Sequence, residues 1–316
     1  MSKARCVLVT GAGGFVGSHI VEALLAAGYA VVAADRHFAP SLRQGWLSRW
    51  STRLTLFEND LLDLPPLEAD AVIHAAAVTA GPEESGQTPE QNFRANVEPA
   101  LRALEWAAGR RLIFLSSAAV FRATAPGLVT ETMPPAPLGL YAVSKVALEY
   151  LVETLRAQYG RAVIAVRLSN IYGPREEARP SRPRLSLVAR LVAEALREGR
   201  VTVWRDDPPR DWTYAPDVGR ALVRLLEAPT LRHALYHVAA EQTLTPQQIA
   251  EALRRWLPHV TLDVREGVSV EGQHLTRRGT LSSGRLHDEL GDIRWTPFEE
   301  GIRAVIEWQR CAEATP

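Results

Sequence analysis

Cysteine is scarce in this sequence, which holds only two cysteines among 316 residues. Cys6 and Cys311 lie near opposite ends, so neither a disulfide framework nor a cysteine-rich zinc site can form. Cys6 stands in an apolar run and is interpreted as a small buried residue. The scattered histidines His74, His237 and His274 are interpreted as packing or pocket residues, and we expect no metal site.

The sequence also has no excess of positive or negative charge, because Lys plus Arg and Asp plus Glu each number 36. A nucleic-acid-binding protein usually carries a basic excess, so we expect no nucleic-acid partner, although a local basic pocket could still bind an anionic substrate. No run of apolar residues is long enough to span a membrane. Residues 1–5 are too polar to begin a signal peptide, and we expect a cytoplasmic protein.

Short apolar runs do alternate with amphipathic stretches through the first half of the chain. The runs predict strands at 6–10, 30–34, 54–57, 71–74, 111–115 and 162–167. Helices are expected at 15–27, near 89–108 and from Tyr141 onward. This order predicts an α/β fold with a doubly wound parallel sheet.

The pattern changes after Pro174. Residues 175–184 are charged and interrupted by proline, and they predict a surface loop. Helices near 185–198, 216–227, 246–256 and 297–309 then mix with short strands at 201–204, 235–238 and 260–264. We therefore expect residues 1–174, with returning segments of the later chain, to form the larger domain, and 175–316 mainly a smaller α/β lobe.

A glycine-rich turn joins the first predicted strand to the first helix. Glycines at Gly11, Gly14 and Gly17 allow a tight turn that can approach a pyrophosphate at the helix N-terminus. Asp35 ends the second strand, where a carboxylate can accept both ribose hydroxyls of an adenosine and would repel a 2′-phosphate. NAD is therefore favoured over NADP, although Arg36 could pair with such a phosphate. The segment that follows, with Trp46 and Trp50, is interpreted as a loop that packs or covers the adenine.

Tyr141 and Lys145 are spaced to share one face at the start of a predicted helix. A nearby ammonium lowers the pKa of a phenol and can make tyrosine a usable base. Ser116 and Ser117 follow a predicted strand, at the sheet edge where ligands of doubly wound folds bind. Taken together, these residues predict a proton-transfer site beside a dinucleotide.

Several motifs, in the order in which they occur along the chain, resemble those of a known family. The matching segments are Thr10-Gly-x-x-Gly-x-x-Gly17, Asp35, Asp60-Leu61, His74-Ala-Ala-Ala77, Asn96-Val97, Ser116-Ser-x-x-Val120, Tyr141-x-x-x-Lys145, Arg167-x-x-Asn-Ile-Tyr-Gly-Pro174, Arg210-Asp-Trp-Thr-Tyr214 with Asp217-Val218, and Tyr236-His-Val238. The chain resembles the extended short-chain dehydrogenase/reductases, specifically the NAD-dependent epimerase/dehydratase family, over roughly residues 5–310. The resemblance implies a Rossmann-type domain and a homodimer formed through helices near 89–108 and 141–159.

The resemblance also implies site residues. The catalytic residues would be Ser117, Tyr141 and Lys145. The cofactor would contact Gly11, Gly14, Phe15, Val16, Gly17, Asp35, Arg36, Asp60, Leu61, Ala75, Ala76, Ala77, Asn96, Ser116, Tyr141, Lys145 and Ser169. The sugar or nucleotide-sugar substrate would contact Thr79, Ser117, Tyr141, Asn170, Arg210 and Arg277.

Two neighbours of Ser117 reduce the number of reactions that the family resemblance allows. Relatives that eliminate water carry Thr-Asp-Glu at the catalytic hydroxyl, whereas Ala118 and Ala119 here cannot exchange protons. A dehydratase or a decarboxylating enzyme is therefore disfavoured, and a 3,5-epimerase would need a further Cys or His pair. The leading hypothesis is a nucleotide-sugar 4-epimerase.

A substrate diphosphate could be gripped by Arg210 and Arg277, because guanidinium groups pair well with phosphate. Departures from the family pattern, such as Thr280 where an Asp often binds ribose, put a uridine handle in question. Arg210 could instead form a surface salt bridge with a neighbouring aspartate. The alternatives are an NAD(P)-dependent dehydrogenase or reductase of a free sugar, sugar acid or other small alcohol, and a dinucleotide-sensing binding protein.

Overall fold

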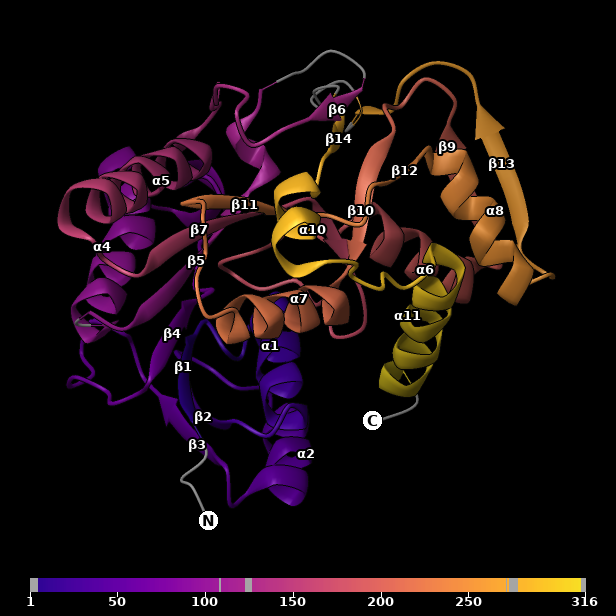
Figure 1. Ribbon diagram of the computed structural model, residues 1–316. Coiled ribbons are helices and arrows are strands. Elements are labelled where there is room, and N and C mark those ends of the chain that lie inside the picture. Colours follow the sequence, from indigo (N-terminus) through magenta and orange to yellow (C-terminus); the bar gives the residue numbers. More distant parts are fainter. Residues whose placement is uncertain (1–4, 108, 123–126, 271, 273–277, 314–316) are drawn as a thin grey trace.

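A parallel sheet with helices on both faces forms the larger part of the molecule (Figure 1). The structure, a computed structural model, describes residues 5–107, 109–122, 127–270, 272 and 278–313. The sheet has the strand order β11-β7-β5-β4-β1-β2-β3, and all of its pairings are parallel. Its strands are β1 (Cys6–Thr10), β2 (Ala30–Asp35), β3 (Leu54–Glu58), β4 (Ala71–His74), β5 (Arg111–Ser117), β7 (Val163–Leu168) and β11 (Leu235–Val238).

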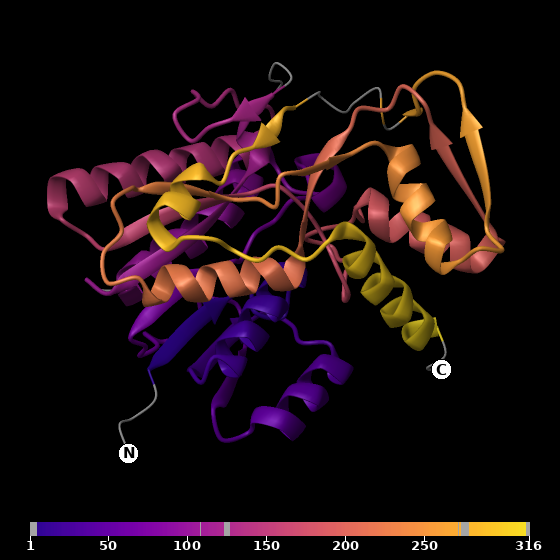
Figure 2. The same ribbon diagram turned by 45° about the vertical axis from the view of Figure 1, so that its right-hand side comes forward.

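Alternate residues of each strand enter two different cores. In β1, Val7 and Val9 pack against α1 (Phe15–Ala26) and α7 (Ala215–Glu227), which lie side by side in Figure 2. Leu8 packs on the opposite face, beneath α4 (Pro89–Ala107) and α5 (Leu140–Tyr159). Because every other side chain points to the same face of a strand, a sheet covered on both faces needs such continuous apolar runs. The predicted doubly wound fold is confirmed.

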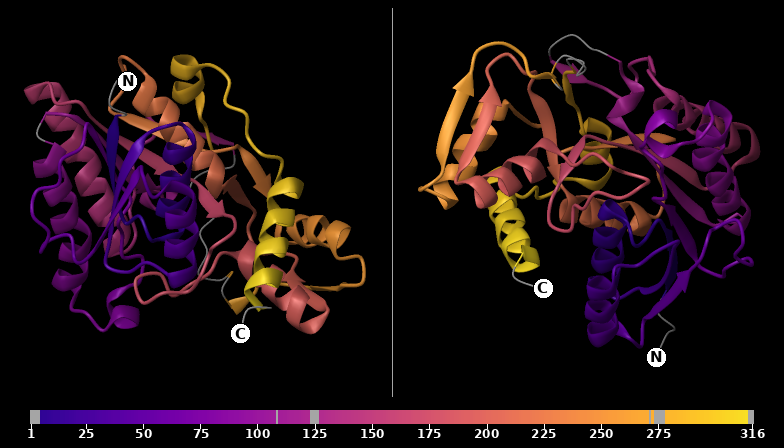
Figure 3. Two further views of the ribbon diagram at one scale, coloured as in Figure 1. Left: turned by 90° about the horizontal axis from the view of Figure 1, so that it is seen from below. Right: turned by 180° about the vertical axis from the view of Figure 1, so that it is seen from behind.

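A smaller lobe follows in the second half of the chain and lies beside the sheet in both views of Figure 3. A third core joins its helices to its short strands. The helices are α6 (Leu187–Glu198), α8 (Pro246–Trp256) and α11 (Phe298–Glu313). The strands are β8 (Asn170–Tyr172), β9 (Arg200–Trp204), β10 (Arg210–Tyr214), β12 (Gln242–Leu244) and β13 (Thr261–Arg265). The boundary near residue 174 stays a prediction, and the segments that return to the large sheet include α7, β11 and α10 (Gly284–Leu290).

Smaller elements connect the two parts. A short parallel pair, β6 with β14, lies above the sheet in Figure 1, and α10 packs on β11. These elements are η1 (Ala118–Val120), β6 (Leu128–Val129), α3 (Pro82–Ser85), β14 (Thr280–Leu281) and α10 (Gly284–Leu290). The crossover between β3 and β4 contains no helix.

The segment after Asp35 differs from the expectation of a loop. It contains the helix α2 (Pro40–Trp50), which begins with a proline in its first turn, a position that proline favours. Trp46 is its one buried residue and packs edge-on against Phe38, while its indole N–H donates to Glu22 at 3.1 Å. Leu42 and Trp50, four residues to either side of Trp46, are partly buried against the same core. The helix therefore has a narrow apolar stripe, which the sequence pattern did not reveal among its polar residues.

Candidate active site

The glycine-rich turn after β1 packs so closely that Gly11 and Gly17 leave no room for a side chain. A Cβ on Gly11 would lie 2.4 Å from the backbone nitrogen of Ala76, and one on Gly17 would lie 1.9 Å from a backbone oxygen. Gly14 caps α1 without any side-chain hydrogen bond, and the first turn of the helix contains no acidic residue. The free N–H groups and the positive end of the helix dipole therefore fit the phosphates of a dinucleotide.

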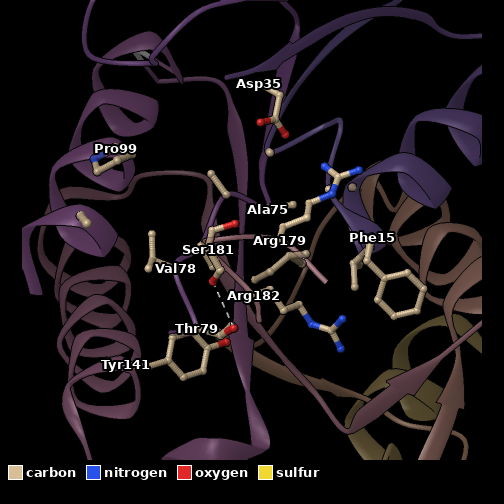
Figure 4. Close-up of a pocket in the computed structure, with 18 of the residues that line it drawn as sticks. Phe15, Asp35, Ala75, Val78, Thr79, Pro99, Tyr141, Arg179, Ser181 and Arg182 are labelled. Carbon is tan, nitrogen blue, oxygen red and sulfur yellow. Dashed lines mark hydrogen bonds between the residues drawn. The ribbon is translucent and has the colours of Figure 1, made fainter. Parts of the chain in front are cut away.

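Asp35 stands at the end of β2, beside this turn. Its Oδ2 accepts a hydrogen bond from the backbone N–H of Gly13 at 2.9 Å. Burial raises the pKa of the Asp35 carboxyl, while backbone hydrogen bonds and the charge of Arg179 act in the opposite direction. Its side chain faces the same cavity as the turn (Figure 4), as a residue that binds adenosine ribose must.

A cavity of about 620 Å³ opens over the carboxyl ends of the central strands. It brings together most of the site residues predicted from the sequence. These are Gly11, Gly14, Phe15, Val16, Gly17, Asp35, Arg36, Asp60, Leu61, Ala75, Ala76, Ala77, Thr79, Ser116, Ser117, Tyr141, Lys145 and Ser169. A single space therefore connects the phosphate turn to the proton-transfer residues, as hydride transfer to a dinucleotide requires.

Among the described residues, three predicted site residues do not line this cavity. Asn96 lies behind it, where its side-chain amide bonds both the N–H and the carbonyl of Val78, at 2.9 and 3.0 Å. Asn170 donates to the backbone oxygen of Asp211 at 3.0 Å, and Arg210 is nine-tenths buried in β10. Arg277 lies outside the described residues. Contact of these residues with cofactor or substrate stays a prediction.

Tyr141 and Lys145 occupy the first turns of α5. The Nζ of Lys145 donates to the carbonyl of Leu115 at 2.9 Å and lies 5.5 Å from the centre of the Tyr141 ring. Burial lowers the pKa of Lys145 to about 8, and the charge of Glu149 opposes that shift. Burial raises the pKa of Tyr141, whereas its hydrogen bond with Ser117 and the charge of Arg182 favour the phenolate. The tyrosine can therefore exchange a proton with a substrate hydroxyl held beside Ser117.

A buried ion pair supports this constellation from behind, and the sequence reasoning missed it. Arg167 of β7 donates through two N–H groups to the carboxylate of Glu149, at 2.9 and 2.7 Å. The side chains are only 3% and 9% exposed. Ser116 also donates its hydroxyl to Glu149, so the residue next to Ser117 is fixed by the pair. The spacing Tyr141, Lys145, Glu149 along one helix face was the available signal.

The segment between β8 and α6 was predicted to be a surface loop, and it is irregular and partly exposed, but it also lines the cavity. Glu177, Arg179, Ser181 and Arg182 line the cavity. Figure 4 shows Arg179, Ser181 and Arg182 lying between Asp35 and Phe15 at one end and Thr79 and Tyr141 at the other. The charged, proline-rich composition shows irregular backbone but cannot show what that backbone covers.

Two of the histidines interpreted as packing or pocket residues, His74 and His237, each form a side-chain hydrogen bond. His74 contacts the hydroxyl of Thr10 through Nδ1 at 2.8 Å, and burial, followed by the charge of Lys145, lowers its pKa to about 3. His237 contacts the carbonyl of Ser282 at 3.1 Å, and burial lowers its pKa to about 3 as well. His274 lies outside the described residues. Within the described ranges, no group of three or more His, Cys, Asp or Glu side chains could hold a metal ion.

Known proteins match this chain over nearly its whole length. The model of the NAD dependent epimerase/dehydratase family matches residues 7–239. A UDP-glucose 4-epimerase from Mycolicibacterium smegmatis is 31% identical over 321 residues, with 96% of this chain and 98% of the relative covered. The solved structure of MoeE5 with UDP-glucuronic acid and NAD is 29% identical, has a TM-score of 0.78, and covers 97% of this chain and 99% of its own.

A second solved structure shares the fold. The UDP-glucose-4-epimerase from Stenotrophomonas maltophila, crystallised with NAD and formylated UDP-arabinopyranose, has a TM-score of 0.83 at 24% identity and covers 99% of this chain and all of its own. The family match, the glycine-rich turn and the Ser-Tyr-Lys constellation agree with one another. The chain is an enzyme that uses NAD, and it belongs to the NAD-dependent epimerase/dehydratase family.

Proposed function

We propose that this enzyme is a nucleotide-sugar 4-epimerase. One observation carries the proposal: Ser117, Tyr141 and Lys145 meet in the cofactor cavity, while Ala118 and Ala119 beside them offer no further acid or base. A dehydratase, a decarboxylating enzyme or a 3,5-epimerase would need a further side chain that exchanges protons. The 4-epimerases among the relatives and solved structures support the same assignment.

The chain's own residues supply the proton chemistry. Tyr141 accepts the proton of the substrate hydroxyl, and Ser117 holds the same oxygen by a hydrogen bond. Lys145, whose pKa burial lowers to about 8, keeps most of its charge at neutral pH and stabilises the phenolate. NAD, which the glycine-rich turn and Asp35 would hold, would supply a reversible hydride acceptor beside the sugar carbon. Tyr141 then returns its proton to the oxygen of the other epimer, which leaves the enzyme unchanged.

The decisive test mixes the purified enzyme with a panel of UDP-, dTDP- and GDP-linked hexoses and uronates and follows epimer pairs by NMR. A 4-epimerase equilibrates one pair without net NADH production. A dehydrogenase, the alternative, would instead accumulate NADH in proportion to substrate, and this result would overturn the proposal. Tyr141→Phe should lower the turnover number by roughly 100-fold or more because the general base is lost, while NAD binding persists.

A homodimer and a cytoplasmic location complete the proposal. The outer faces of α4 and α5 expose Leu101, Val143 and Tyr150, whose exposed fractions are 42%, 39% and 58%. Pairing these faces from two copies would bury the apolar side chains in a four-helix contact. Sedimentation of the enzyme and of Leu101→Glu tests the dimer. No helix in the described part of the chain has the length and hydropathy to cross a membrane.

A further inference from the structure

The segment between Arg175 and Ser186 spans the cavity and is anchored on both sides of it. On the side of β4, the carbonyl of Ser181 accepts the backbone N–H groups of Thr79 and Ala80 at 2.8 and 3.2 Å. Figure 4 marks a further hydrogen bond from the Thr79 hydroxyl to the same carbonyl, 3.3 Å long. This side of the segment is therefore held by main-chain bonds that do not depend on exposed side chains.

The opposite side is anchored on the phosphate turn. Arg179 donates from Nη1 to the carbonyl of Gly13 at 2.7 Å. Arg175 pairs with Glu22 of α1 at 3.0 Å and contacts His19 at 2.7 Å. The segment thus connects the turn that receives phosphate to the strand end that faces the reacting sugar.

Internal bonds give this segment a fixed shape. Glu176 is 3% exposed and accepts hydrogen bonds from the backbone N–H and the hydroxyl of Ser186, at 2.7 and 2.6 Å. Arg182 pairs with the same carboxylate at 2.5 Å. The backbones of Arg179 and Arg182 bond each other at 3.0 and 2.8 Å. Such a segment keeps its position without a ligand and loses little entropy when one binds.

Arg179 brings a positive charge to the phosphate turn. The glycine-rich turn offers N–H groups but no cation, and a dinucleotide brings two negative charges to it. Arg179 places a guanidinium at the turn, three-quarters buried, with a loose ion pair to Glu177 at 3.8 Å. Guanidinium groups bind phosphate oxygens with two directed N–H bonds.

We propose that Arg179 is a ligand of the cofactor diphosphate and that residues 176–182 strap the dinucleotide into the cavity between turnovers. This inference rests on the proposed function, since a redox-neutral epimerase gains by keeping its NAD. A dehydrogenase must release NADH in every cycle and would have to break the anchors on both sides each time.

The test measures release of the cofactor instead of catalysis. Enzyme loaded with isotopically labelled NAD is chased with unlabelled NAD, and the retained label is read by mass spectrometry after rapid desalting. Wild-type enzyme should keep its label through many turnover times. Arg179→Ala and Arg179→Gln should release it roughly 10- to 100-fold faster, because a charge-assisted hydrogen bond to phosphate is lost. The glutamine variant keeps an N–H donor and serves if the alanine variant is unstable.

A matched control lies on the same segment. Arg184 is 77% exposed and pairs with Glu84 at 2.7 Å, and it does not line the cavity. Exposed pairs contribute little, so Arg184→Ala should change the release rate less than about fivefold. Equal release from wild type and both Arg179 variants overturns the inference, as does wild-type exchange within one turnover. If the enzyme retains NAD but epimerises no substrate, the proposed function is refuted, while the inference about Arg179 and residues 176–182 still holds.

Discussion

The buried pair of Arg167 and Glu149 offers a quantitative test of how the active site is supported. Arg167→Met would leave the Glu149 carboxylate buried with only Ser116 as its remaining donor. Removing one partner of a buried ion pair costs about 3–5 kcal/mol, a large part of the roughly 5–15 kcal/mol that stabilises a typical protein. At about 2 °C per kcal/mol for a chain of this size, the thermal midpoint should fall by roughly 6–10 °C.

The assay is thermal unfolding followed by circular dichroism, with the NAD concentration held constant because a bound ligand shifts the midpoint. Arg94→Met is the matched control, since Arg94 pairs with Glu98 at 3.8 Å with side chains 70% and 45% exposed. It should lower stability by less than about 1 kcal/mol. The double variant Arg167→Met/Glu149→Leu removes both charges and should recover most of the loss.

A midpoint within about 2 °C of wild type for Arg167→Met would refute this reasoning, because the carboxylate would then be shown to reach solvent. The reasoning would also be refuted if the double variant lost as much stability as the two single variants added together. The loss would then come from packing and not from an unpaired charge. Arg167 also lies over the ring of Phe121, 4.9 Å from its centre, and the double variant separates that contact from the charge.

Three further predictions concern single residues. Gly17→Ala should abolish NAD binding in calorimetry, because its Cβ would lie 1.9 Å from a backbone oxygen of the phosphate turn. Arg182→Leu removes a charge that lowers the pKa of Tyr141, so the rising limb of the pH–turnover profile should move to higher pH, and Arg182→Lys should restore it. Burial lowers the pKa of His74 from 6.5 to about 3. As pH falls below 6.5, the histidine takes up a proton in the unfolded chain before it does so in the folded one, and stability is therefore lost. At pH 5 this loss is about 2 kcal/mol, and urea unfolding of His74→Asn should show a shallower acid slope.

Much of the sheet was predictable because buried parallel strands must be apolar on both faces. The run from Cys6 to Thr10 shows this, and the glycines after it mark a turn that other backbone approaches closely. Tyr141 and Lys145 were predictable for a similar reason, because a helix brings residues four apart to one face. The helix α2 was missed because its apolar stripe, Leu42, Trp46 and Trp50, is narrow and lies among polar residues.

Other features depend on contacts between distant parts of the chain. Ser181 meets Thr79 across the cavity, and no composition of residues 175–184 reveals that partner. Asn170 and Arg210 carry groups suited to phosphate, yet β8 and β10 pair so that the Asn170 amide bonds the backbone of Asp211. Residue type therefore located the groups that one element brings to the cavity, whereas contact of Asn170 and Arg210 with a substrate stays a prediction.

The last strand of the central sheet has a consequence for how this chain folds. β11 (Leu235–Val238) pairs with β7 at the edge of the sheet, and α7 covers the core beneath. The sheet is therefore complete only after part of the second lobe has been synthesised. Until then β7 presents an unpaired edge that can recruit strands from other chains. Long-range parallel pairing of this kind is slow. A nascent chain that stops near residue 174 would thus be the species most dependent on chaperones and most open to aggregation.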